Sequence, residues 1–264
     1  MIYKYTDLFN LNGVIMKKIS ILISLLFLFP SFACADDVLG VYAGVGFWTQ
    51  NVEGFVDYNG SNVGLEDDLK LENDSGIQFY IAFEHFVPML PNIKVAHSKI
   101  STTGTHVISE SFVFDNVTYN VNESIDSKFQ LDNTDLIFYY EVLDNWINLD
   151  LGLDVKVLNG NVQIYSQTTA QSASKSFDVP VPMLYAKAQI DVPATGLYIS
   201  GEASAIEYDG SGVTDFKILA GYEFDYGLGF ELGWRSFGVE IDDADGLTSD
   251  INVEGVFGNL RYHF

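Results

Sequence analysis

Residues 147–157, Ile-Asn-Leu-Asp-Leu-Gly-Leu-Asp-Val-Lys-Val, alternate between apolar side chains and polar or small ones. A period of two places successive side chains on opposite faces of a β-strand. The segments that share this pattern are 147–157, 184–192, 197–205, 215–225, 228–235 and 255–264. Together, one face holds 30 positions and no charged residue, whereas the other holds 28 positions and 13 charged residues. In a soluble sandwich the uncharged face is the core, and in a transmembrane barrel it faces lipid.

Strand length and turn length decide between these two folds. The segments are longer than the roughly 5–6 residues typical of soluble strands and match the roughly 9–11 needed to cross a membrane at a tilt. Short connections are expected near 87–92, 143–146, 193–196 and 225–227, and mostly longer ones at 51–74, 107–127, 160–176, 209–213 and 241–250. Short periplasmic turns that alternate with longer outer loops are typical of outer-membrane barrels.

The sequence therefore predicts an all-β fold, a closed antiparallel transmembrane β-barrel of about ten strands. Eight or twelve strands are the alternatives, because 107–127 could add a hairpin. The expected strands are 39–50, 75–87, 92–106, 128–142, 147–160, 177–193, 196–208, 213–225, 227–240 and 251–264.

Composition excludes several classes of protein. The 264 residues include 13 Lys and Arg against 36 Asp and Glu, a formal charge of −23, so the chain lacks the basic surface that binds nucleic acid. Apolar residues make up 48% and aromatic residues 14%, which is too much for a disordered acidic chain. A single cysteine forms no internal disulfide framework and no cysteine-based zinc site. No cofactor is expected.

The first 35 residues read as an export signal. Met16-Lys17-Lys18 precedes the apolar run 19–29, and Ala33-Cys34-Ala35 forms an A-x-A cleavage site. We predict a signal peptide over 1–35, with translation beginning at Met16, and a barrel over 36–264. Cys34 raises the alternative of a lipoprotein, but Ser31-Phe32-Ala33 fits that signal poorly. Export through the periplasm and insertion into the outer membrane of a Gram-negative bacterium are the expected route.

Aromatic residues near the expected strand ends predict two interfacial girdles. At the periplasmic side these are Phe86, Trp146, Tyr198, Tyr222, Phe224, Tyr226, Tyr262 and Phe264, and at the outer side Trp48, Tyr208 and Trp234.

Four segments resemble a family of small gammaproteobacterial outer-membrane β-barrels of unknown activity. They are EHFVPMLPNIKV (84–95), YYEVLDNWINLDLGL (139–153), VPMLYAKAQIDVPATGL (181–197) and GYEFDYGLGFELGWRSF (221–237). The family's first motif is expected to read Glu-His-Pro, whereas Phe86 follows Glu84-His85 here. The final Tyr262 and Phe264 look like the signal that such barrels present to the barrel-assembly machinery. The resemblance implies a fold and a location, not a reaction.

Charged residues on the polar faces are expected to point into the lumen. Because buried charges must be paired, they predict a network of ion pairs that plugs a narrow barrel. A narrow path for small solutes or cations is the alternative. The predicted network comprises Asp150, Asp154, Lys156, Lys187, Asp191, Glu202, Lys217, Glu223, Glu231, Arg235 and Arg261.

No residues form a convincing catalytic constellation, so no enzyme activity is expected. The histidines show no metal-ligand spacing such as HExxH. His106 and Asp115 are candidates for the outer rim but form no pair in sequence. The neighbours His97 and Ser98 fall on opposite faces of a strand, which argues against a dyad.

The expected outer loops are strongly acidic. Residues 240–250 hold Glu240, Asp242, Asp243, Asp245 and Asp250 without a basic residue, and 51–74 hold seven acids against Lys70. Carboxylates are ligands for divalent cations, so Asp242, Asp243 and Asp245 are weak candidates for cation binding beside lipopolysaccharide. The sequence predicts a structural or interaction barrel, with outer-membrane lipids and lipopolysaccharide as its surroundings.

Overall fold

The computed structural model describes residues 39–264, except 59–60, 67–68, 70, 88, 110 and 245–246. The predicted signal peptide over 1–35 lies outside the described residues. No helix among the described residues is long and apolar enough to cross a membrane.

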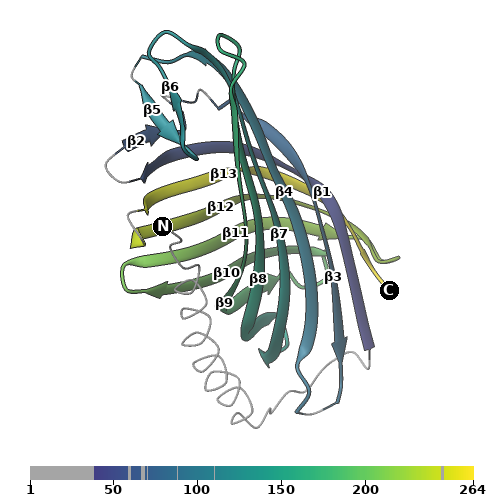
Figure 1. The fold of residues 1–264 in the computed structure, drawn as a ribbon. Helices are drawn as coiled ribbons and strands as arrows, with labels where there is room; N and C mark the ends of the chain where they lie inside the picture. Colours follow the sequence, from purple (N-terminus) through teal and green to yellow (C-terminus); the bar gives the residue numbers. More distant parts are fainter. Residues whose placement is uncertain are drawn as a thin grey trace.

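Ten antiparallel strands close into a barrel (Figure 1). Each strand pairs with the next one in the barrel, and β13 returns to pair with β1 from Tyr42↔His263 to Tyr58↔Leu247. The barrel strands are β1 (Leu39–Tyr58), β3 (Asp74–His85), β4 (Asn92–Val107), β7 (Ser124–Leu143), β8 (Ile147–Ser166), β9 (Ser172–Asp191), β10 (Leu197–Tyr208), β11 (Ser211–Glu223), β12 (Leu228–Ala244) and β13 (Leu247–His263). Closure pairs the backbone groups that an open edge would expose to lipid.

Three short strands complete the fold. β2 (Ser61–Gly64) pairs with the end of β1, and β5 (Phe112–Phe114) pairs with β6 (Val117–Tyr119) as a separate hairpin. The prediction of ten barrel strands is confirmed. The hairpin suspected within 107–127 exists but does not join the barrel.

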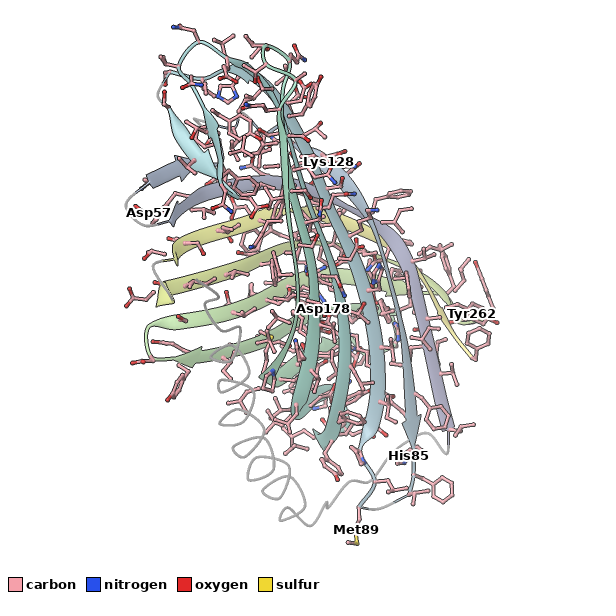
Figure 2. The ribbon with its side chains drawn as sticks, in the orientation of Figure 1. Asp57, His85, Met89, Lys128, Asp178 and Tyr262 are labelled. Atoms are coloured by element: carbon pink, nitrogen blue, oxygen red, sulfur yellow. The ribbon has the colours of Figure 1, made fainter. Side chains whose placement is uncertain are left out.

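The two ends of the barrel differ in turn length and define its orientation. Figure 2 places His85 and Met89 at the end with the short turns, which we take as periplasmic, and Asp57 and Lys128 toward the other end. Outward-facing side chains near the short turns are apolar and exposed; on β12, for example, Leu232 is 63% exposed whereas its neighbour Glu231 is 7% exposed and faces the lumen. This apolar band is the surface that meets lipid.

Polarity reverses along the long strands. On β8 the outward side chains are apolar up to Val157, and the next outward positions are Asn159, Asn161 and Gln163. The inward positions change in the opposite sense, from Asp154 and Lys156 to apolar residues such as Leu158 and Ile164. Beyond the lipid band the wall is therefore built like a soluble protein, apolar inside and polar outside. We call this part, with β2 and the β5–β6 hairpin, the outer cap.

The outer cap has its own hydrophobic core. Large side chains from both sides of the barrel meet in it, and Trp48, Ile125 and Phe237 are fully buried. The segment after β2 contributes Leu65, Leu69 and Leu71, and the hairpin region adds Ile108 and Tyr119.

This reversal corrects two predictions. The sequence predicts strand ends where the lipid-facing pattern stops, but β1, β8 and β12 continue past it, so 51–58, 160–166 and 241–244 are strand rather than loop. Trp48 and Tyr198 were expected in the interfacial girdles, yet both are buried inside the barrel. Other girdle residues, including Phe86, Trp146, Tyr226 and Phe264, are exposed as expected.

Candidate functional site

The candidate site is the lumen of the membrane-spanning part, where five charged residues form one cross-strand row. The register aligns them directly across neighbouring strands from β8 to β12 as Asp150↔Lys187↔Glu202↔Lys217↔Arg235. Lys187 Nζ lies 3.4 Å from Asp150 Oδ2, and Lys217 Nζ lies 3.1 Å from Glu202 Oε1. Opposite charges on facing positions stabilise strand pairing, so the alternating part from Asp150 to Lys217 favours this register. Lys217 and Arg235 are like charges that face each other, and each pairs with a carboxylate instead.

Lys94 joins this row from the other side of the lumen. It lies on β4, and its Nζ forms a close ion pair with Glu202 Oε2. Glu202 thus accepts from two lysines that come from strands far apart in sequence. The contact ties the two sides of the barrel together across its interior.

A second group of charges begins at Arg235, the last member of the row, and extends to the core of the outer cap, where Lys156 and Arg235 lie against Phe237 and Trp48. Lys156 Nζ donates to Asp215 Oδ2 at 2.9 Å and forms a close ion pair with Asp135. Arg235 binds Asp215 through two bonds, from Nε at 2.9 Å and from Nη2 at 2.6 Å, and its guanidinium stacks 4.5 Å from the ring centre of Trp48. All of these side chains are buried. We call Asp135, Asp154, Lys156, Asp215 and Arg235 the buried ion cluster.

Tyrosines surround a further carboxylate, Glu231. Its Oε1 accepts from Tyr80 at 2.9 Å and from Tyr198 at 3.0 Å, while Asn259 donates to Oε2 at 2.9 Å. Glycines make room for these rings, because a Cβ at Gly44 would lie 2.3 Å from Tyr80. Glycine at this position is therefore required for the close approach of the ring.

The remaining predicted lumen residues lie nearer the periplasmic end. Arg261 Nη1 lies 2.8 Å from Glu223 Oε2, and His263 Nδ1 lies 3.2 Å from the other oxygen of Glu223. Asp191 accepts from Asn148 at 2.8 Å and from Gln189 at 2.9 Å. Every predicted network residue except Asp154 thus forms an ion pair or hydrogen bond with a charged or amide side chain of the barrel, and Asp154 contacts the hydroxyl of Ser204.

A cavity of about 170 Å³ runs through this part of the lumen. Its lining extends from Asp144, in a short periplasmic turn, to Asp135 and Arg235 of the buried ion cluster. Above that level lies the apolar core of the outer cap. The geometry is that of a pocket in the periplasmic half of the lumen, bounded by the core on its outer side.

Sequence reasoning missed several residues of the lumen. Lys94, Asp135 and Glu141 lie on β4 and β7, where the apolar outward pattern is too short for these strands to join the six clearly alternating segments. Asp215 was assigned to the polar face of its strand but not to the network. Along β7 the inward positions include Ile125, Phe129 and Leu131, so the rule that apolar residues face lipid does not identify the inward face of this strand.

The weak candidates for cation binding are only partly described. Asp242 is exposed near the end of β12, and its N–H donates to Ser211 Oγ at 3.1 Å. The side chains of Asp243 and Asp245 lie outside the described residues. Within the described part of the chain, no three His, Cys, Asp or Glu side chains are close enough to hold a metal ion.

The other sequence candidates are separated by the fold. Asp115 lies 3.8 Å from Lys175 at the tip of the β5–β6 hairpin. His97 faces outward and bonds Thr134 at 3.0 Å, whereas Ser98 is buried in the lumen. Tyr262 and Phe264 contact each other edge to face on the outer surface, with ring centres 4.4 Å apart, and Figure 2 shows Tyr262 at the edge of the barrel.

Closed barrel, apolar lipid band and polar lumen together define an outer-membrane β-barrel protein, and the same fold is found in a solved structure. The outer membrane protease OmpT from Escherichia coli is similar with a TM-score of 0.59 and 11% identity, over 85% of this chain and 97% of that chain. Ail from Yersinia pestis matches with a TM-score of 0.35 and 11% identity, over 86% of this chain and 100% of that one. No family model and no curated protein sequence matches the chain.

Proposed function

We propose that this protein is a closed, non-conducting outer-membrane barrel that acts by presenting its outer cap at the cell surface, in a structural or interaction role. The observation that carries this proposal is the position of the hydrophobic core. It lies across the outer half of the lumen, on the route that a solute would have to follow.

A conducting barrel needs a continuous polar path. Here a path from the periplasmic pocket first meets Lys156 and Arg235, which are 0% and 2% exposed, and then the fully buried rings of Trp48 and Phe237. Breaking these ion pairs would leave buried charges uncompensated, which is costly. The ion pairs and the core both support a plugged lumen.

The outer surface supports an interaction role. Exposed carboxylates such as Glu53, Glu66, Glu240 and Asp250 surround the cap. Their chemistry suits a basic partner, or lipopolysaccharide bridged through divalent cations. We infer a binding rather than a catalytic role, since no nucleophile, base and orienting group are found together among the described contacts.

Single-channel recording of the refolded protein in planar bilayers tests the proposal. We expect no conductance steps, and a known porin refolded in the same way serves as the positive control. Replacing Trp48 and Phe237 together by alanine should not open the pore while the ion cluster remains. Stable, cation-selective steps from the unaltered protein would overturn the proposal in favour of a narrow channel.

A further inference from the structure

Asp154 is the unusual member of the buried ion cluster. It lies on β8 inside the membrane-spanning part and is 1% exposed. Its cross-strand neighbours in register are Ile137 on β7 and Met183 on β9, both of them buried and apolar. A carboxyl group in such surroundings has lost its hydration, and a charge there needs a partner.

The other acids of the cluster form ion pairs, whereas the described contacts give Asp154 no ion pair and a hydrogen bond only to the neutral hydroxyl of Ser204. Asp135 pairs with Lys156, and Asp215 pairs with both Lys156 and Arg235. Oδ1 of Asp154 has no hydrogen-bond partner at all. The two cations of the cluster, Lys156 and Arg235, are thus already paired with the carboxylates of Asp135 and Asp215.

The groups that face Asp154 do not supply a free cation. Ser204 on β10 contributes a hydroxyl, Lys156 on β8 is shared with Asp135 and Asp215, and these two carboxylates on β7 and β11 repel a charge on Asp154. Further along the lumen, two cations, Lys94 and Lys217, share the single carboxylate of Glu202, which leaves one positive charge in excess there. Both lysines bind Glu202 and line the pocket, so neither pairs with Asp154. Glu231 beside that pocket is a further carboxylate held by hydroxyl and amide donors.

We propose that Asp154 binds a proton and is a neutral carboxylic acid in the folded protein. With the proton bound, the cluster carries two negative and two positive charges, so its net charge changes from −1 to zero. The proton also gives Asp154 a donor, which an ionised carboxylate lacks, among neighbours that include two carboxylate acceptors. A neutral, fully paired cluster can remain buried beneath the apolar core of the cap.

A proton fits this position better than a metal cation. The described acids do not converge in an arrangement that could hold a metal ion. Lys156 Nζ already lies between Asp135 and Asp215, where a cation would have to bind. The inference goes beyond the proposed cell-surface role and does not depend on it.

Thermal unfolding of the full chain in detergent tests the proposal through a pair of matched variants. Asp154→Asn copies the shape of the neutral acid, so we expect its unfolding midpoint to equal or exceed that of the unaltered protein at pH 7. Asp215→Asn removes a paired carboxylate and should lower the midpoint. If Asp154→Asn lowers the midpoint as much as Asp215→Asn does, Asp154 is ionised and the proposal is wrong.

The pH dependence has a definite sign. An unfolded Asp releases its proton near pH 4, so a proton retained in the folded state makes stability fall as pH rises above about 4. The difference in midpoint between Asp154→Asn and the unaltered protein should therefore be small at pH 4 and widen toward pH 8. A difference that stays constant over this range contradicts the proposal.

Infrared spectroscopy provides a readout independent of folding. The unaltered protein at pH 7 should show the carbonyl stretch of a protonated carboxylic acid, and Asp154→Asn should lose it. Absence of that band in the unaltered protein would overturn the proposal. So would a midpoint that rises when sodium replaces choline at constant ionic strength, if Asp154→Asn abolishes the rise, because a metal cation would then occupy the site.

Discussion

Single residues of the outer cap act as clamps between its loops, and Glu123 is the clearest example. It follows the β5–β6 hairpin, and its carboxylate accepts from Ser166 at 2.6 Å and from the backbone and side chain of Asn120, both at 2.9 Å. The Ser166 hydroxyl, followed by the Asn120 donors, lowers the pKa of Glu123 to about 2. The clamp thus joins the hairpin region to the β8–β9 turn.

We predict a specific acid sensitivity from this clamp. Because the folded pKa lies below the unfolded value near 4.3, the stabilisation is complete above that value and is lost as pH falls toward about 2. Glu123→Gln should lower the unfolding midpoint at pH 7, and the difference should shrink as pH falls from about 5 to 2. The exposed Glu207→Gln is the control, and an equal effect from both variants would contradict the clamp.

At the scale of elements, β9 has an open edge above the membrane. β10 pairs with β9 only from Leu184 to Asp191, so Ser172–Met183 has no strand on that side among the described residues. Figure 1 shows β8 and β9 rising away from β10 and β11. Val192 N donates to Leu197 O at 2.8 Å, which places the N–H groups of even-numbered β9 residues on the open side. Pro180 and Pro182 occupy two of these positions and remove the donors.

We predict that these prolines prevent edge-to-edge association. Replacing both with threonine restores two donors, and the purified protein should then form larger species in detergent, measured by light scattering after size exclusion. Val179→Thr is the control, because its N–H faces β8 instead. A monodisperse double variant would show that the prolines have no such role.

The elements also show what the sequence could predict and what it could not. Ten strands and eleven inward charged residues followed from alternation, since lipid imposes an apolar outward face on the membrane-spanning part of each strand. The partners of Lys187, Glu202 and Lys217 did not follow, because pairing depends on register between strands. Trp48 and the length of β1 were missed for another reason. Above the membrane the wall faces water instead of lipid. The apolar face of a strand then points inward, whereas within the membrane it points outward.

At the scale of the whole molecule, this change from lipid to water shows where the outer boundary of the membrane lies along the barrel. Leu232 and Glu240 lie on the same strand and face outward, Leu232 in the lipid band and Glu240 in the cap. Leu232→Arg should destabilise the barrel in bilayers by about 2–4 kcal/mol, whereas Glu240→Arg should cost about 0–1 kcal/mol. Urea titration of the protein in lipid vesicles measures both. Equal costs at the two positions would place the membrane boundary elsewhere.

The outer cap also determines when different parts of the protein can form and how the inserted barrel is retained. Outward residues such as Asn161 and Lys128 must cross the hydrocarbon before they reach water, and the apolar groups opposite them find no partners until both walls have arrived. The cap core can therefore assemble only after the strands have crossed the bilayer. Once formed, the cap is a folded part with a polar surface on the outer side of the membrane, and it cannot pass back through the hydrocarbon while folded. Extraction of the barrel toward the periplasm then requires the cap to unfold first, so the lifetime of insertion depends on the stability of a region that touches no lipid.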